Sequence, residues 1–236
     1  MINANALLEK FLGPNATSQI GQAGSTAKQS LDNVGLGGFG GGAITGGILG
    51  LLVGSKKMRK MAGGIVGYGG AAAAGALAYK AYQNWEGGKA VASAPLASQT
   101  DVANLDRSFI PGATPAAGGQ SFELVMIKAM IAAAKADGHI DVQEQKNLFE
   151  QVEKMGLDAE SKAFVFDALN QPADMGQLVA AVQGIEQATE LYLISRIAID
   201  LDHPAERAYL QALGHRLNLP LDLVAHLEHQ VSATEK

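Results

Sequence analysis

The chain has 236 residues, of which 47% are hydrophobic and 17% charged, and its formal net charge is −5. It contains no cysteine, which excludes disulfides, thiolate catalysis and cysteine-ligated zinc. Residues 1–88 carry a net charge of +4 and residues 121–236 a net charge of −9, and the acidic second part argues against nucleic acid as a partner. This separation is typical of a basic membrane segment joined to a soluble domain.

Residues 1–33 are expected to form a polar amino-terminal tail. Within it, Leu7, Leu8, Phe11 and Leu12 can form one short amphipathic turn. No charged start followed by an apolar run is present, so we expect no cleavable signal peptide.

Residues 34–85 are rich in glycine and alanine. The uncharged stretch 34–54 has a glycine at every fourth residue, and a second uncharged stretch, 61–79, repeats the spacing. In water each interior glycine costs a helix roughly 1 kcal/mol relative to alanine, whereas in a bilayer small residues four apart let two helices pack closely. We therefore predict a membrane helix or helical hairpin that forms a homo-oligomer; a glycine-rich disordered linker is the alternative. The predicted packing residues are Gly38, Gly42, Gly46, Gly50, Gly54, Gly63, Gly67 and Gly75.

A basic loop, residues 56–60, separates the two uncharged stretches. Its cationic residues are Lys56, Lys57, Arg59 and Lys60, and such clusters stay on the cytoplasmic side of a membrane. A single crossing by residues 34–54 then puts the amino terminus outside and the carboxyl domain in the cytoplasm, and this arrangement is favoured. A hairpin of both stretches would put both ends outside.

Residues 86–120 are predicted to be a flexible linker, because glycine, alanine, serine and proline dominate. Pro95, Pro111 and Pro115 interrupt any helix in this segment.

In residues 121–236 the apolar residues recur with the period of a helix, which predicts an all-α bundle of about seven helices. The expected helix starts are Ser121, Asp141, Asp158, Asp174, Glu186, Pro204 and the residue after Pro220. The fifth helix, residues 186–199, is apolar nearly all round and is therefore expected at the centre of the bundle. Arg196 within it is expected to pair with a buried carboxylate such as Asp200. The histidines of the last two helices are expected at solvent-exposed positions.

Two acidic turns in this domain resemble one another. Residues 136–144 and 198–206 each lead into a helix, and a shift of 62 positions aligns Glu144 with Glu206. These turns resemble those of the bacterial inner-membrane YebE family, which consists of uncharacterised proteins with a TerB-like carboxyl-terminal domain. The resemblance implies a TerB-like helical fold and an inner-membrane location. It implies no settled activity, and a role in the envelope or in a stress response follows only by analogy.

The same resemblance implies a divalent-cation site at the two turns. The candidate ligands are Asp137, Asp141, Glu144, Asp200, Asp202 and Glu206. The first turn departs from a calcium loop because it lacks a bidentate glutamate at the twelfth position. The alternative is that these carboxylates cap the following helices and interact favourably with the positive amino-terminal ends of their dipoles.

No catalytic motif is present in the sequence, and two functional hypotheses remain. The first is a membrane-anchored interaction module that recruits a protein partner. The second is a metal-binding or metal-responsive domain, with or without hydrolytic activity, that uses the two acidic turns.

Overall fold

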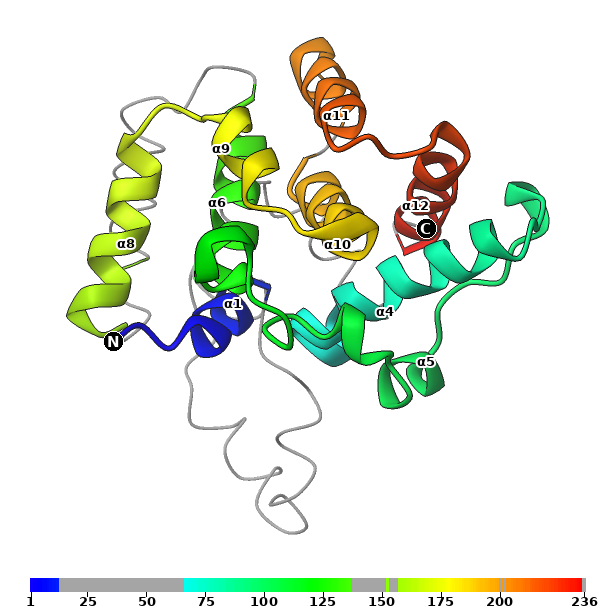
Figure 1. Cartoon of the computed structure of the whole chain (residues 1–236), viewed down its shortest axis with the longest axis horizontal. Helices are drawn as coiled ribbons and strands as arrows, with labels where there is room; N and C mark the ends of the chain where they lie inside the picture. Colours follow the sequence, from blue (N-terminus) through cyan, green and yellow to red (C-terminus); the bar gives the residue numbers. More distant parts are fainter. Residues whose placement is uncertain (13–65, 137–151, 153–156, 200, 202, 235–236) are drawn as a thin grey trace, which may run out of the picture.

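The computed structural model describes residues 1–12, 66–136, 152, 157–199, 201 and 203–234. Every regular element among these residues is a helix, which confirms the all-α prediction for this part of the chain (Figure 1). The α-helices are α1 (Ala4–Leu12), α4 (Val66–Glu86), α5 (Gln99–Ala103), α6 (Phe122–Ala134), α8 (Ala159–Asn170), α9 (Met175–Ala180), α10 (Gly184–Ile197), α11 (Pro204–Arg216) and α12 (Leu221–Thr234). Three short 3-10 helices are η2 (Val91–Ser93), η3 (Arg107–Phe109) and η4 (Ala117–Gly119).

The starts of α6, α8 and α9 lie where the sequence predicts them. The side chains of Ser121, Asp158 and Asp174 accept hydrogen bonds from the backbone N–H three residues later, at 3.4, 2.8 and 3.1 Å. Each bond satisfies one of the free N–H groups at a helix start. These predictions are confirmed because capping is a local interaction. The helix expected after Asp141 lies outside the described residues.

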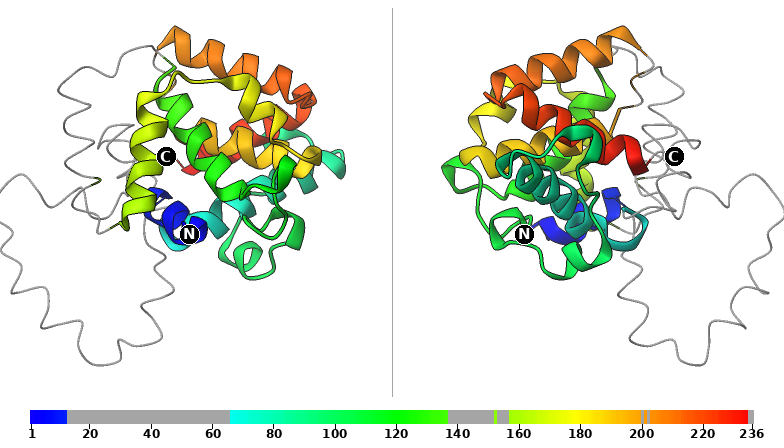
Figure 2. Two further views of the ribbon diagram at one scale, coloured as in Figure 1. Left: turned by 60° about the vertical axis from the view of Figure 1, so that its left-hand side comes forward. Right: turned by 90° about the vertical axis from the view of Figure 1, so that its right-hand side faces the viewer.

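Helix α10 is the centre of the bundle, as its nearly continuous apolar sequence predicts. Its residues from Gln187 to Ile197 are all buried. It packs against α6, α4, α12 and α11 (Figures 1 and 2). Other elements therefore shield it from water on every face.

Helix α4 belongs to the same core, which differs from the membrane location predicted for residues 61–79. Its buried residues are Ala71, Ala73, Ala74, Ala76, Leu77, Ala78 and Ala81. They pack against α12, α10 and α1. Small residues permit close helix packing in a water-soluble core as well as in a bilayer, so their spacing alone does not distinguish the two. No helix within the described residues combines the length and hydrophobicity needed to cross a bilayer.

Gly75 lets η3 approach α4. A Cβ atom at this position would lie 2.2 Å from the carbonyl oxygen of Phe109, a distance that no real side chain tolerates. The ring of Phe109 stacks at an angle on Tyr79 and Tyr82, with centroids 5.2 and 5.5 Å away. The small residue therefore serves a contact within the chain, whereas the sequence suggested a contact between membrane helices.

Residues 86–120 pack on the helical core, which differs from the predicted flexible linker. They contain η2, α5, η3 and η4, and of these η2, α5 and η3 contact α12, α4 or α10. The backbone N–H of Ala117 donates to the carbonyl of Ala181 at 2.8 Å. The amide of Gln187 donates to the carbonyls of Thr114 and Pro115 at 3.1 Å. A few long-range hydrogen bonds thus anchor a segment whose composition alone suggested disorder.

Helix α1 confirms the short amphipathic element expected near the amino terminus and makes it part of the core. Leu7, Leu8, Phe11 and Leu12 are exposed by only 0–3%. The helix packs on α6 and α4, and the amino group of Met1 forms an ion pair with Glu160 on α8. The chain before residue 13 is therefore attached to the carboxyl-terminal helices, and the domain does not begin at residue 121.

Candidate functional site

Most of the residues predicted for a function lie outside the described part of the chain. These are the metal candidates Asp137, Asp141, Glu144, Asp200 and Asp202, the glycines Gly38, Gly42, Gly46, Gly50, Gly54 and Gly63, and the cationic residues Lys56, Lys57, Arg59 and Lys60. Gly67 lies in the first turn of α4. Of the predicted metal ligands, the structure describes Glu206.

Glu206 takes part in the cap of α11. Its carboxylate accepts a hydrogen bond from the backbone N–H of His203 at 3.1 Å, while Nδ1 of His203 accepts one from the N–H of Ala205 at 3.2 Å. The helix begins at Pro204, as predicted, but its N-cap is His203 and not Asp202. The cap satisfies free N–H groups at the helix start. Among the described residues no group of three or more histidine and acidic side chains could hold a metal ion.

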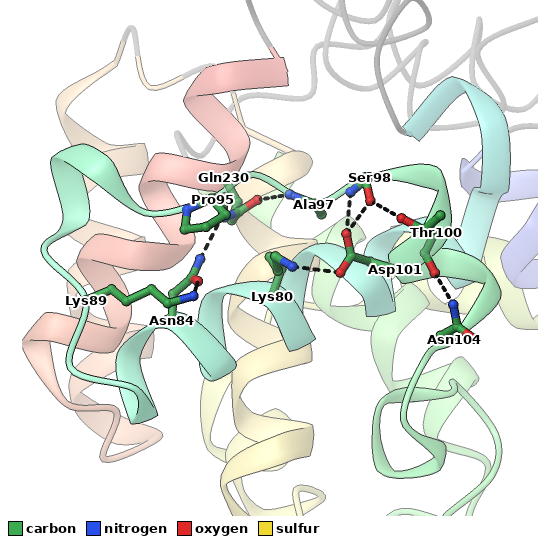
Figure 3. A network of polar contacts seen from close by, with 10 residues as sticks. All are labelled: Lys80, Asn84, Lys89, Pro95, Ala97, Ser98, Thr100, Asp101, Asn104 and Gln230. Carbon is green, nitrogen blue, oxygen red and sulfur yellow. Dashed lines mark hydrogen bonds and ion pairs between the residues drawn. The ribbon is translucent and has the colours of Figure 1, made fainter.

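A network of polar contacts joins α4 and α12 to residues 95–97 (Figure 3). Oε1 of Gln230 accepts from the N–H of Ala97 at 2.9 Å, and its amide nitrogen donates to the carbonyl of Pro95 at 2.9 Å. Nδ2 of Asn84 donates to the same carbonyl at 2.8 Å, and Oδ1 of Asn84 accepts from Lys89. Asn84 and Gln230 are completely buried. Buried amides with partners on both atoms hold a segment firmly in place.

The second half of this network is an ion pair between α4 and α5. Nζ of Lys80 donates to Oδ1 of Asp101 at 2.8 Å, and Oδ2 of Asp101 accepts from the N–H and hydroxyl of Ser98 at 2.8 and 2.5 Å (Figure 3). Burial alone would raise the pKa of Asp101, but the hydrogen bonds from Lys80 and Ser98 together hold that pKa below its usual value. Nζ of Lys80 and the hydroxyl of Ser98 thus both donate to Asp101, and these contacts join α4 to the start of α5.

A partly buried charge cluster connects α10 with α12. Nε of Arg196 donates to Oε2 of Glu228 at 2.7 Å, and the hydroxyl of Tyr192 donates to Oε1 at 2.9 Å. Burial, and then the neighbouring Glu228, raises the pKa of Tyr192 well above its usual range. Arg196 thus pairs with a carboxylate on another helix, whereas the sequence suggested Asp200, which lies outside the described residues. The sequence gives no signal for this partner because 32 positions separate the two residues.

Glu190 and His226 are ionisable side chains that are buried with one atom lacking a hydrogen-bond partner. Glu190, in the middle of α10, and His226, on α12, are each 2% exposed, and Oε1 of Glu190 and Nδ1 of His226 have no hydrogen-bond partner. Burial raises the pKa of Glu190 to about 8. The buried position of His226 differs from the exposed position expected for it. An acidic residue directly before the apolar run Leu191–Ile194 was the sequence signal for Glu190, and the prediction missed it.

A shallow groove lies between α6, α8 and α9. Lys128, Lys135, Gln171 and Asp174 contribute to its lining. Nζ of Lys135 donates to the carbonyls of Leu169 and Gln171 at 2.7 and 2.6 Å, which satisfies free carbonyls at the end of α8. Lys135 therefore has a structural role at the end of α8.

Comparison with known proteins gives a family but no activity. The family model described as "Protein of unknown function (DUF533)" matches residues 38–231. The "Uncharacterized protein in ampR 5'region" of Yersinia enterocolitica is 36% identical over 106 residues, which are 45% of this chain and 76% of that protein. No solved structure matches the chain. Because the family model covers most of the chain, from the glycine-rich stretch to α12, this protein belongs to the DUF533 family of proteins of unknown function.

Proposed function

We propose that this protein is a helical interaction module attached to the bacterial inner membrane by its glycine-rich stretch, residues 34–54. The helical domain faces the cytoplasm and acts by binding a protein partner. The resemblance to the inner-membrane YebE family supports this location, and it implies a TerB-like fold and a context in the envelope or in a stress response.

The packing of α1 on α4 constrains how the chain can be attached to a membrane. Helix α1 precedes the glycine-rich stretch and α4 follows it, yet the two helices contact each other and share a core with α6. Both ends of the intervening chain therefore emerge from one folded body. Any membrane segment between them has to begin and end on the same side of the bilayer.

This constraint changes the topology that the sequence suggested. A single crossing by residues 34–54 would separate α1 from α4 by the bilayer. Two crossings need about 40 predominantly apolar residues, and the long uncharged stretch of the intervening chain, residues 34–54, supplies only about half of them. We therefore propose that residues 34–54 enter the bilayer from the cytoplasmic face and return to it. The cationic residues 56–60 favour that face.

Self-association is part of the same proposal. A re-entrant segment is tolerated where protein buries its backbone. The strip of Gly42, Gly46 and Gly50 allows a second copy to approach closely enough to do so. The homo-oligomer would thus form in the membrane and display several acidic helical domains.

Binding is favoured over catalysis because the polar clusters of the described residues serve the fold. The pairs Lys80–Asp101 and Arg196–Glu228 are satisfied within the chain, and so is the amide of Gln230. The net charge of −9 on residues 121–236 suits a partner with a basic surface. The alternative, a divalent-metal-binding TerB-like domain, is addressed by a melting experiment below.

Cysteine labelling tests the topology, because the natural chain has no cysteine. Asn5 on α1 and Ser232 on α12 are both exposed, so Asn5→Cys and Ser232→Cys each provide one reactive thiol. A membrane-impermeant maleimide is expected to label both variants in inverted vesicles and neither in right-side-out vesicles. Labelling of the two positions from opposite sides would overturn the proposed topology.

Flotation with phospholipid vesicles tests the anchor. The full chain is expected to float, and a chain that lacks residues 34–54 is expected to remain in the dense fraction with its helical circular dichroism unchanged. Equal flotation of both chains would mean that another part of the protein binds the membrane.

A further inference from the structure

Helix α1 occupies a seat on the surface of α4 and α6. We use "α1 seat" for the faces of these two helices that α1 covers. The seat buries the four large apolar side chains of α1. Beside the seat, the Met1 amino group forms an ion pair with Glu160 of α8. The contact is thus apolar along the helix and charged at its amino end.

Helix α1 depends on this seat for its structure. It has nine residues, and isolated helices shorter than about 12 residues are marginal in water. The cap of α1 is local and lies at the surface, where the N–H of Ala6 donates to Oδ1 of Asn3. Docking and helix formation therefore occur together, and an empty seat would expose apolar surface of α4 and α6.

We propose that the α1 seat is exchangeable, and that in the oligomer α1 of one copy of this chain occupies the seat of a second copy. The exchange creates no new type of contact, because the same side chains meet in either case, which makes domain swapping a low-cost route to an oligomer. The charge of the chain supports the fit, since the α1 amino terminus is cationic and the domain that holds the seat is acidic.

The length of chain between α1 and the seat permits the exchange. Residues 13–65 join Leu12 to Val66, so 53 residues of covalent chain are available. Such a length can extend over a distance on the order of 170 Å, far more than the diameter of one domain. Closing so long a loop within one chain has an entropic cost. This cost reduces the difference in free energy between docking of α1 on the seat of its own chain and docking on the seat of a neighbour.

The exchange needs a second copy of the chain nearby. For this requirement alone it rests on the proposed function, in which the glycine strip forms an oligomer. Copies held together through Gly42, Gly46 and Gly50 would keep a second seat within reach of each α1. The effective concentration of that second seat would then be comparable with that of the first.

Zero-length carbodiimide cross-linking of the full chain tests this proposal, because it joins paired amino and carboxylate groups. At the α1 seat the reagent is expected to form an amide between the Met1 amino group and Glu160. If α1 is exchanged between copies, this amide links two chains, which run as a covalent dimer on a denaturing gel. If α1 docks within its own chain, the amide is found in the monomer band. Peptide mapping by mass spectrometry then measures the amide in each band.

We expect a third or more of the Met1–Glu160 amide in the dimer band. Finding all of it in the monomer band, or finding none of it in either band, would overturn the exchange. Glu160→Gln is the matched control at an exposed position and should remove this amide while leaving the other cross-links. Phe11→Ser should remove it from both bands by undocking α1.

Gly46→Leu separates the failure of the exchange from that of the glycine-mediated oligomer. If the dimer amide disappears in this variant but is present in the natural chain, both proposals are supported. If the dimer amide persists in Gly46→Leu, the exchange stands and the glycine strip is not what brings the copies together. If the natural chain is an oligomer whose amide lies only in the monomer band, the strip stands and the exchange is wrong.

Discussion

Glu190 lies in the middle of α10, where 2% of its surface is exposed and Oε1 has no hydrogen-bond partner. An ionised carboxylate in such a position loses its hydration without compensation. Burial therefore raises the pKa of Glu190 from 4.5 to about 8. Near neutral pH the folded protein holds a proton here that the unfolded chain releases.

This proton makes stability depend on pH. Below pH 4.5 Glu190 is protonated in both the folded and the unfolded state, so it does not make the free energy of unfolding depend on pH. Between pH 4.5 and about 8 only the folded state keeps the proton, so the free energy of unfolding falls as pH rises, by up to about 1.4 kcal/mol for each pH unit. We expect Glu190→Gln, which cannot ionise, to lack this contribution. Urea unfolding of both proteins at pH 5, 6, 7 and 8 measures it, and parallel curves would contradict the prediction.

The cluster around Glu228 illustrates the opposite treatment of a buried charge. Arg196 is 3% exposed and Glu228 31%, so the pair is partly buried. Removing one partner of a buried pair leaves the other charge without compensation.

We therefore expect Glu228→Ala to lower the free energy of unfolding by about 3 kcal/mol. Tyr192→Phe is the matched control, because it removes one hydrogen bond to the same carboxylate and should cost about 1 kcal/mol. Chemical denaturation compares the two variants. Equal losses would mean that the arginine finds another partner when Glu228 is absent.

At the scale of elements, residues 94–117 behave as part of the domain. The long-range bonds from Ala97 to Gln230 and from Ala117 to Ala181 fix the two ends of this segment independently. Backbone N–H groups in such bonds exchange slowly with solvent, whereas those of a flexible linker exchange at once.

We predict slow hydrogen exchange for the amides of Ala97, Phe109 and Ala117 in the natural chain. Gln230→Ala should accelerate exchange around Ala97 by at least tenfold, because the amide loses its acceptor. Ala117 is an internal control and should remain protected. Immediate exchange at all three amides of the natural chain would restore the interpretation of this segment as a linker.

At the scale of the whole molecule, α1, α4, α6 and α8 to α12 share one core. A single cooperative melting transition is therefore expected, and this transition reports on any ligand that binds the folded state.

Melting of the full chain decides between the interaction and metal hypotheses. The carboxylate of Glu206 is engaged in the cap of α11, so we expect the same melting temperature in EDTA and in Mg²⁺, Ca²⁺ or Zn²⁺. A cation at 100 times its dissociation constant would add about 2.7 kcal/mol to the stability. Glu206→Ala should cost about 1 kcal/mol through the lost cap. A cation-dependent rise that Glu206→Ala abolishes would favour the metal hypothesis.

The sequence by itself determined the helical class and several helix starts. Ser121, Asp158 and Asp174 cap their helices through hydrogen bonds to residues three positions away, and Pro204 begins α11 as predicted. The central position of α10 also followed from its composition. These features depend on neighbours in the chain, so local chemistry suffices to predict them.

Only the tertiary structure decided where the small residues of α4 pack, which carboxylate pairs with Arg196 and whether residues 86–120 are anchored. The bond that holds Ala97 joins residues 133 positions apart, and no local pattern encodes such a partner. A helix face of alanine and glycine fits a lipid-embedded neighbour and a core helix equally well, because both accept close backbone approach. In the structure the neighbours of α4 are the core helices α12 and α10. Which helix packs against a face of small residues thus depends on the rest of the fold.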